Sequence, residues 1–168
     1  MLIVVKSMQQ LNTEQLTAVY RETNRKNGQI FYPDHAPHKQ LDLAEEAFLD
    51  YLRQDFFRQR GAFYCLWEEE GVYRSALRLE PYRDGLLLQA LETAPDARRK
   101  GYARALIAET FAYLEKTDTQ VVYSHVSKQN LPSLSLHKAC GFVVFSDTAT
   151  YLDGTVTQGS FTLSYTYK

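Results

Sequence analysis

Hydrophobic and polar positions along this chain follow two different periods, which predicts a sheet combined with helices. Residues 2–6 (LIVVK) form a short apolar run typical of a strand, and AFYCLWEEEGVYRSALRL predicts two strands joined at a Glu-Gly turn. Residues 86–93 (LLLQALET) are almost continuously apolar, as in a strand that is covered on both faces. QVVYSHV predicts a further strand, and the C-terminal segment predicts a hairpin around Asp153 and Gly154.

Apolar residues recur every three or four positions in four other segments, which predicts four helices. The first runs from Asn12 or Thr13 to about residue 25, and the second covers about residues 43–57. Between them, residues 24–40 contain two prolines and a glycine, and they are predicted to be the longest irregular segment of the chain.

The two later helices carry clearer boundary signals. One follows Gly101, and the other lies in NLPSLSLHKACG, where Asn130 fits an N-cap, Pro132 falls in the first turn and Gly141 fits a C-terminal stop. The order of the elements predicts a single α/β domain over residues 1–168, with a mixed sheet rather than a Rossmann array.

Composition and charge exclude several classes of protein. A net charge of −1 provides no general basic field, so neither nucleic acid nor a membrane surface is an expected partner. Cys65 and Cys140 lie far apart without a C-x-x-C pair, which fits a reducing cytosol rather than a disulfide framework or a zinc site. The first apolar run is too short for a signal peptide or a membrane span, so we expect a cytoplasmic protein.

Three cations stand at a predicted helix start, where basic residues are normally disfavoured. Arg98, Arg99 and Lys100 directly precede Gly101. The first N–H groups of a helix have no intrahelical partners and carry partial positive charge, so an anion bound there would explain the cations. Gly101 would let the backbone approach a ligand closely, and Ala103 would keep the next turn open. The alternative is a solvated basic turn that binds nothing.

Two motifs, in this order and spacing, resemble those of the GNAT superfamily of acyl-CoA-dependent N-acetyltransferases. Residues 98–103 (RRKGYA) match Q/R-x-x-G-x-G/A, which follows the fourth strand in that family. NLPSLSLHKACGF resembles N-x-x-A-x-x-L-Y-x-x-x-G-F, which follows the fifth. The resemblance covers about residues 86–142, whereas the N-terminal third matches only in the order of its elements. It implies a mixed, mostly antiparallel central sheet of about seven strands, flanked by about four helices.

The resemblance also implies acetyl-CoA as the co-substrate and no metal. Backbone amides of residues 98–104 would hold the coenzyme A pyrophosphate, and the backbone of Leu91 and Thr93 would pair with the pantetheine arm as an added strand does. Asn130 matches the family's asparagine near the cofactor. The residues expected at the pyrophosphate are Arg98, Arg99, Lys100, Gly101, Tyr102, Ala103 and Arg104.

Acyl transfer to an amine requires a base for the amine, a stabilised thioester oxygen and a proton for the departing thiolate. Glu92 is our first candidate for the base, because it is the only acidic residue in its strand. His125, on the next strand, is the other candidate. Gln89 stands where some relatives carry glutamate, and a bulge of the kind usual in the family would change which face each side chain takes. The alternative for Glu92 is a structural hydrogen bond at the strand end.

His137 stands where the family motif usually carries tyrosine. Its helical spacing from Asn130 and Ser133 predicts that it faces the same side as Asn130. A histidine can donate a proton to a thiolate because its pKa of about 6.5 lies close to neutral pH. The alternative is that His137 only forms a hydrogen bond to the cofactor or the sheet. Cys140 is expected to be a buried residue at the helix end, because direct attack by the amine needs no enzyme nucleophile.

The resemblance implies that the first two helices and the connection between them wall the acceptor site. This connection carries Phe31, Tyr32, His35 and His38, with Asp34 as its only acid. An aromatic and partly polar wall suits a small amine or an amino-acid-like acceptor. The alternative is a surface loop with two solvated histidines, and two histidines without a third ligand do not indicate a metal site.

Two functional hypotheses follow. The first is an N-acetyltransferase that acetylates a primary amine by direct attack. The second is a non-catalytic acyl-CoA-binding regulatory module, which the missing motif tyrosine and Gln89 would favour. The aromatic last strand, with Phe161, Leu163, Tyr165 and Tyr167 alternating, either forms a homodimer edge or fills the core.

Overall fold

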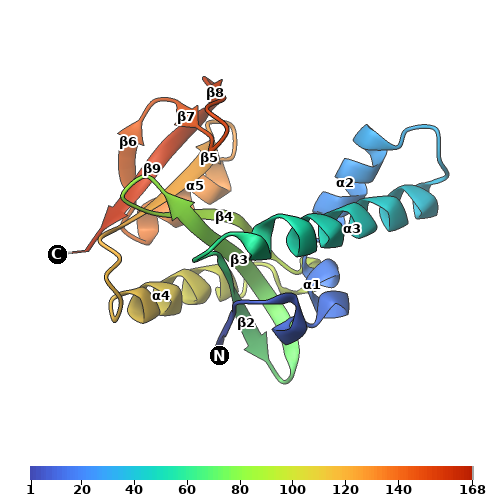
Figure 1. Ribbon diagram of the computed structural model, residues 1–168, viewed down its shortest axis with the longest axis horizontal. Coiled ribbons are helices and arrows are strands. Elements are labelled where there is room, and N and C mark those ends of the chain that lie inside the picture. Colours follow the sequence, from blue (N-terminus) through green and yellow to red (C-terminus); the bar gives the residue numbers. More distant parts are fainter. Residues whose placement is uncertain (168) are drawn as a thin grey trace.

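The computed structural model describes residues 1–167, and its centre is a seven-stranded sheet with helices on both faces (Figure 1). The strands of this sheet are β1 (Leu2–Val5), β2 (Phe63–Glu69), β3 (Val72–Tyr82), β4 (Gly85–Thr93), β5 (Val121–Ser127), β6 (Val143–Ser146) and β9 (Ser160–Thr166). Their order is β1-β2-β3-β4-β5-β9-β6, and only β4 and β5 are parallel neighbours. The predicted mixed and mostly antiparallel sheet is confirmed.

A separate two-stranded hairpin precedes the last strand. It consists of β7 (Ala149–Thr150) and β8 (Val156–Thr157), and its turn contains Asp153 and Gly154 as the sequence predicted. The last strand, β9, does not pair with this hairpin but lies between β5 and β6 in the main sheet.

Helices cover the two faces of the sheet. The α-helices are α1 (Thr13–Val19), α2 (Arg21–Phe31), α3 (Pro37–Gln54), α4 (Tyr102–Leu114) and α5 (Leu131–Ala139), and short 3-10 turns are η1 (Met8–Gln10), η2 (Phe56–Arg58) and η3 (Pro95–Ala97). The first predicted helix is divided at Tyr20 into α1 and α2, which accounts for the fifth helix. No helix of residues 1–167 combines the length and the apolar character that crossing a membrane requires.

Of the two residues proposed for the first cap, Asn12 is the cap, and the predicted cap at Asn130 is confirmed. The Asn12 side-chain oxygen accepts a hydrogen bond from the Gln15 N–H at 3.1 Å, and the Asn130 side-chain oxygen accepts one from the Ser133 N–H at 3.2 Å. Each bond satisfies one of the N–H groups that a helix start leaves without an intrahelical partner. Gly141 follows the end of α5 with a φ of 91°, a conformation that favours glycine.

The prediction of a long irregular segment over residues 24–40 was wrong. α2 continues to Phe31 and α3 already begins at Pro37, so only residues 32–36 lie outside the two helices. Gly28 lies inside α2 because α3 passes close to it: a Cβ at this position would stand 2.5 Å from the carbonyl oxygen of Gln40. Pro37 occupies the first position of α3, where its missing N–H is tolerated. Gly28 therefore marks the close packing of α2 and α3, and Pro37 marks the start of α3.

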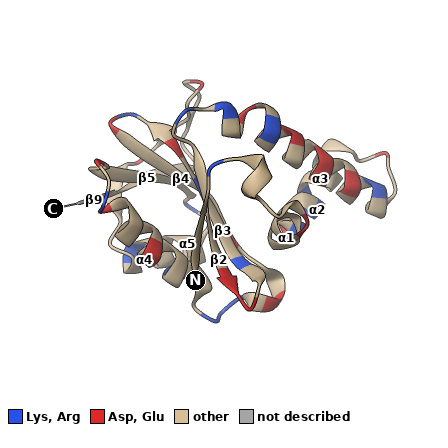
Figure 2. Cartoon of the chain, turned by 60° about the horizontal axis from the view of Figure 1, so that its bottom comes forward, with Lys and Arg blue, Asp and Glu red and all other residues tan. Residues whose placement is uncertain are grey.

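The sheet divides the core into two layers. On one face, Tyr64 and Ala76 of β2 and β3 pack with Leu16 of α1 in a cluster that also contains residues of α3. On the other face, Leu77 packs with Leu106 of α4. Charged residues of both signs follow one another along α3 (Figure 2), in keeping with the small net charge.

The strands β4 and β5 separate in the middle of the sheet. Within residues 1–167, they pair where residues 86–88 meet residues 122–124, and the β5 side of β4 has no strand partner beyond Leu88 in this described part of the chain. A bulge adds to this opening: Arg78 pairs with Gln89 and Ala76 with Glu92, while Ala90 between them has a φ of 51°. The irregularity expected in this strand is therefore present, at Ala90.

Candidate active site

The separation of β4 and β5 opens two adjoining clefts. The inner cleft, of about 180 Å³, lies between residues 88–91 of β4 and Ser124, His125, Asn130 and His137. The outer cleft, of about 520 Å³, lies between the end of β4 and the starts of α4 and α5. The two clefts share Leu91, Asn130 and Ser133 among their lining residues, so together they form one continuous channel along the unpaired edge of β4.

The N-terminus of α4 lies at the outer cleft. Gly101 precedes the helix with a φ of 87°, and no side chain caps the first N–H groups. A Cβ at Gly101 would meet no atom within 4 Å, so this glycine is required for its backbone conformation and leaves open space in front of the helix. Ala103 lines the outer cleft. This end of a 13-residue helix is therefore suited to an anion.

The side chain of Arg98, the first of the three cations before Gly101, is bound by other residues of the protein. An Nη atom of Arg98 lies 2.6 Å from an oxygen of Glu22 on α2, and the other Nη lies 3.9 Å from Oε2 of Glu92. The Nε–H of Arg98 donates to the Thr93 carbonyl at 3.3 Å. Arg98 thus ties the end of β4 to α2.

The other basic and aromatic residues of this turn differ in where their side chains lie. Arg99 and Lys100 are exposed, and Arg99 adopts a φ of 62°. The Tyr102 hydroxyl donates to a carboxylate oxygen of Glu69, and Arg104 lines a different cavity on the far side of α4. Tyr102 and Arg104 therefore contribute to the start of α4 through their backbone.

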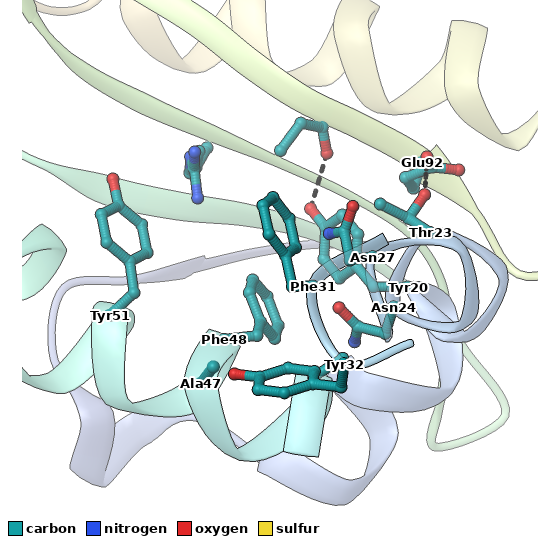
Figure 3. A pocket seen from close by; sticks show the side chains of 13 residues that line it. Tyr20, Thr23, Asn24, Asn27, Phe31, Tyr32, Ala47, Phe48, Tyr51 and Glu92 are labelled. Carbon is teal, nitrogen blue, oxygen red and sulfur yellow. Dashed lines mark hydrogen bonds between the residues drawn. The ribbon is translucent and has the colours of Figure 1, made fainter. Parts of the chain in front are cut away.

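An aromatic pocket of about 440 Å³ lies on the other side of β4, between α2, α3 and the sheet (Figure 3). Phe31 and Tyr32 line it as the sequence predicted, together with Phe48 and Tyr51 of α3. The pocket shares Ala90 with the inner cleft, and it shares Thr23 and Glu92 with the outer cleft. It meets the channel at the bulge of β4.

Glu92 lies at the boundary between the aromatic pocket and the outer cleft. Its Oε1 accepts a hydrogen bond from the Thr23 hydroxyl at 2.7 Å, drawn as a dashed line in Figure 3, and its side chain is 30% exposed. Close by, the Tyr20 hydroxyl donates to the Ala90 carbonyl at 2.6 Å. Hydrogen bonds from α2 and from the residue before it therefore orient both the carboxylate and the bulge.

His137 is buried on α5, with 2% of its surface exposed, and it lines the inner cleft together with Asn130. Its Nδ1 lies 2.8 Å from the Ser133 carbonyl, which can only accept, so the proton belongs on Nδ1. Nε2 then accepts from the Ser124 hydroxyl at 3.0 Å. Burial lowers the pKa of His137, which leaves the ring neutral at pH 7. The predicted orientation toward the side of Asn130 is confirmed.

His125 lies on the inner cleft, away from the aromatic pocket. Its ring stands edge-on to Tyr82 and to Tyr151, with centroid distances of 5.4 and 5.0 Å. Burial lowers the pKa of His125. Cys140 is partly buried at the end of α5, and burial raises the pKa of its thiol.

A family model described as the acetyltransferase (GNAT) family matches residues 16–142. This chain belongs to the GNAT family of acetyltransferases. The matched residues contain α2, α3, the bulge of β4, and the starts of α4 and α5, which are the elements that form the channel and the aromatic pocket. No curated protein is significantly similar to the chain in sequence.

Solved GNAT structures share the fold over nearly the whole chain. The PaiA N-acetyltransferase of Thermoplasma acidophilum, in complex with coenzyme A, has a TM-score of 0.67 at 14% identity and covers 99% of both chains. The ribosomal-protein-alanine N-acetyltransferase of Brucella melitensis has a TM-score of 0.62 at 18% identity, covering 98% of this chain and 99% of the other. A chimera containing the spermidine N-acetyltransferase of Vibrio cholerae has a TM-score of 0.58 at 15% identity, covering 98% and 95%.

Some residues that line the channel and the aromatic pocket were not singled out as site residues from the sequence, and some expected residues lie elsewhere. His35, His38 and Asp34 are exposed and do not line the aromatic pocket, because the helices on either side of them extend further than predicted. Within residues 1–167, no group of three or more His, Cys, Asp or Glu side chains is placed to hold a metal ion. The residues that reasoning from the sequence missed are Tyr20, Thr23, Asn24, Asn27, Phe48, Tyr51, Arg78 and Ser124.

Proposed function

We propose that this GNAT protein transfers an acetyl group from acetyl-CoA to the primary amine of a small molecule or amino-acid-like acceptor, by direct attack. The observation that carries the proposal is the bulge at Ala90, where the channel between β4 and β5 meets the aromatic pocket. A cofactor in the channel and an acceptor in the pocket would approach each other at this point. Glu92 lines both spaces beside it.

The residues of the channel fit coenzyme A. The unpaired edge of β4 at Leu91 and Thr93 suits the amide-bearing pantetheine arm, which would add to the sheet as a strand does. The start of α4 suits the pyrophosphate through the backbone of residues 98–104, with the exposed cations of Arg99 and Lys100 beside it. Arg98 would contribute mainly through its backbone, since its guanidinium is held by Glu22 and Glu92. Acetyl-CoA bound there would supply the activated acyl group.

Glu92 is the proposed general base. An ammonium group with a pKa near 10 must lose a proton before its nitrogen can bond to the acyl carbon, and a carboxylate can accept that proton directly or through one water. Thr23 and Arg98 hold Glu92 at the inner end of the aromatic pocket, where the acceptor amine would arrive. The carbon–sulfur bond of the thioester then breaks and the thiolate leaves.

For His137, the hydrogen bonds favour the structural alternative over the role of general acid. Its only ring proton is donated to the Ser133 carbonyl, and Nε2 accepts from Ser124. A neutral ring with both nitrogens engaged has no proton directed into the cleft. We therefore propose that His137 joins α5 to β5 at the inner cleft and positions Ser124.

Thermal unfolding with and without acetyl-CoA, with AMP as the control ligand, tests the cofactor. At a hundredfold excess over Kd, binding adds about 2.7 kcal/mol to the free energy of unfolding. A panel of amines with detection of released thiol then tests the transfer. A shift without consumption of any acceptor would favour the non-catalytic acyl-CoA-binding module.

Glu92→Gln tests the base. We expect kcat to fall by about 10²–10⁴-fold with the acetyl-CoA affinity unchanged. The matched control is Glu22→Gln, which removes the other carboxylate bound to Arg98 and does not line the aromatic pocket. Because Glu22 lines the outer cleft, the two variants are compared at saturating acetyl-CoA. Equal losses in the two variants would show that Glu92 acts only through Arg98.

A further inference from the structure

Arg78 places a cation without a carboxylate partner in the wall of the aromatic pocket. Its guanidinium lies over the ring of Tyr51 at 5.0 Å and near the ring of Phe56 at 5.6 Å, and one Nη donates to the Gln89 side chain at 3.3 Å. Its Nε is shielded from solvent and makes no hydrogen bond within residues 1–167. Aromatic rings and an amide compensate a buried charge only in part, so an anion at this position would be stabilised.

Among residues 1–167, no carboxylate forms an ion pair with Arg78. Glu80 follows two residues later on β3 and is 2% exposed, and its charge helps to raise the pKa of Arg78. It does not contact the guanidinium within 4.0 Å and does not line the pocket, so it leaves the pocket side of Arg78 without a partner. Glu92 is held by Thr23 and Arg98.

The strand register puts this cation and the proposed base on one wall. Ala76 and Arg78 lie two residues apart on the same face of β3, and they pair with Glu92 and Gln89, respectively. Two residues of a strand span about 7 Å, which is the scale of a single amino acid with a hydrogen-bonding partner at each end. Between the two charged groups, the pocket offers the rings of Phe31, Phe48 and Tyr32.

We propose that the acceptor is a free amino acid with an apolar or aromatic side chain, and that its carboxylate binds Arg78. This inference rests on the proposed function, because transfer at the bulge is what brings the amine to Glu92. The α-ammonium gives a proton to Glu92, the nitrogen bonds to the acyl carbon, and the carbon–sulfur bond breaks to release the coenzyme A thiolate. The carboxylate is unchanged and stays paired with Arg78. A peptide N-terminus lacks a carboxylate at this distance from its amine.

The exposed edge of the pocket agrees with an apolar side chain. Phe31 is 70% exposed at the end of α2, and Ile30 beside it is 67% exposed. Of these two residues Phe31 lines the pocket, so its ring adds apolar surface for the side chain of an acceptor.

The test compares three probes that differ only at the carboxylate: L-phenylalanine, L-phenylalaninamide and phenethylamine. For the wild-type protein with acetyl-CoA, we expect kcat/KM for L-phenylalanine to exceed that for either amine by about 10- to 100-fold, the range for hydrogen bonds between charged groups. Arg78→Met should remove this preference, so that the three probes give similar kcat/KM values in that variant, and Arg78→Lys should restore part of it. Arg53→Met, on the exposed side of α3, is the control and should change neither value.

Binding measured by calorimetry separates the two proposals. If no amine is acetylated but L-phenylalanine and 3-phenylpropanoate bind, and Arg78→Met weakens both, the carboxylate site stands and the proposed transfer is overturned. If kcat/KM for phenethylamine, L-phenylalaninamide or spermidine equals or exceeds kcat/KM for L-phenylalanine, the transfer stands and the amino-acid acceptor is overturned. If Arg78→Met does not fold, kcat/KM for the three probes on the wild-type protein still tests whether the carboxylate of the acceptor is recognised. Absence of both binding and transfer overturns both proposals.

Discussion

Gly28 sets how closely α2 and α3 approach each other, and both helices line the aromatic pocket. In Gly28→Ala, the new Cβ would stand 2.5 Å from the carbonyl oxygen and 2.7 Å from the carbonyl carbon of Gln40. Ordinary contacts begin at 3.4 Å, so the two helices would have to separate by about 0.9 Å at this point. The contacted atoms belong to the backbone of α3, and no side chain can rotate away to relieve the overlap.

Two effects of Gly28→Ala oppose each other. Replacing glycine by alanine inside a helix contributes about 1 kcal/mol of stability through backbone conformation alone. Overpacking costs about 1–3 kcal/mol, and a backbone contact belongs at the upper end of that range. We expect the free energy of unfolding to fall by about 1–2 kcal/mol, which lowers Tm by about 2–8 °C in a domain of this size.

Thermal and denaturant unfolding measure this change, with Gln29→Ala as the control on the exposed side of α2. Gly28→Ala should also raise KM for the acceptor, because the pocket wall moves, while the affinity for acetyl-CoA stays the same. A gain of about 1 kcal/mol in Gly28→Ala, the value for helix propensity alone, would refute the reasoning.

The remaining predictions concern His137 and the two cysteines. Because burial lowers the pKa of His137 in the folded protein, the unfolded chain takes up a proton on this residue at a higher pH than the folded chain does. The free energy of unfolding should therefore fall as the pH drops below about 6.5, by at most about 1.4 kcal/mol per pH unit for this group. Denaturant unfolding at each pH should give a shallower slope for His137→Gln than for the wild type, and an unchanged slope would contradict the assignment. Burial raises the pKa of the Cys65 thiol to about 12 and also raises that of Cys140, so thiol-selective reagents should label neither quickly in the folded protein at pH 7.4. Cys140→Ala should keep its acyl-transfer activity, and a loss with normal folding would point to an enzyme nucleophile.

The elements that sequence reasoning predicted best are those whose signals are local. The caps at Asn12 and Asn130 act on N–H groups within three residues, so their effect does not depend on the rest of the fold. Gly28 and Pro37 also give local signals, but ambiguous ones. A glycine suits a turn or a close helix contact, and a proline suits a loop or a first helical turn, and only the position of α3 distinguishes these alternatives.

Residue spacing predicted the aromatic pocket less well than it predicted the helix caps. Phe48 and Tyr51 recur at the spacing of a buried helix face, and Arg78 lies in a strand among apolar neighbours. Periodicity shows that such residues face inward, but it does not show whether they meet other side chains or an open space. Phe31 and Tyr32 were predicted because their segment was expected to wall the acceptor site.

The family, the mixed sheet and the positions of the two motifs followed from the amino-acid order, because each motif is a pattern of neighbouring residues at a helix start. The separation of β4 and β5, the pairing of Arg98 with Glu22, and the position of Arg78 beside Tyr51 and Gln89 were known only from the folded chain. These features join residues that are 11 to 76 positions apart, and contacts over such separations depend on how whole elements pack rather than on any short pattern.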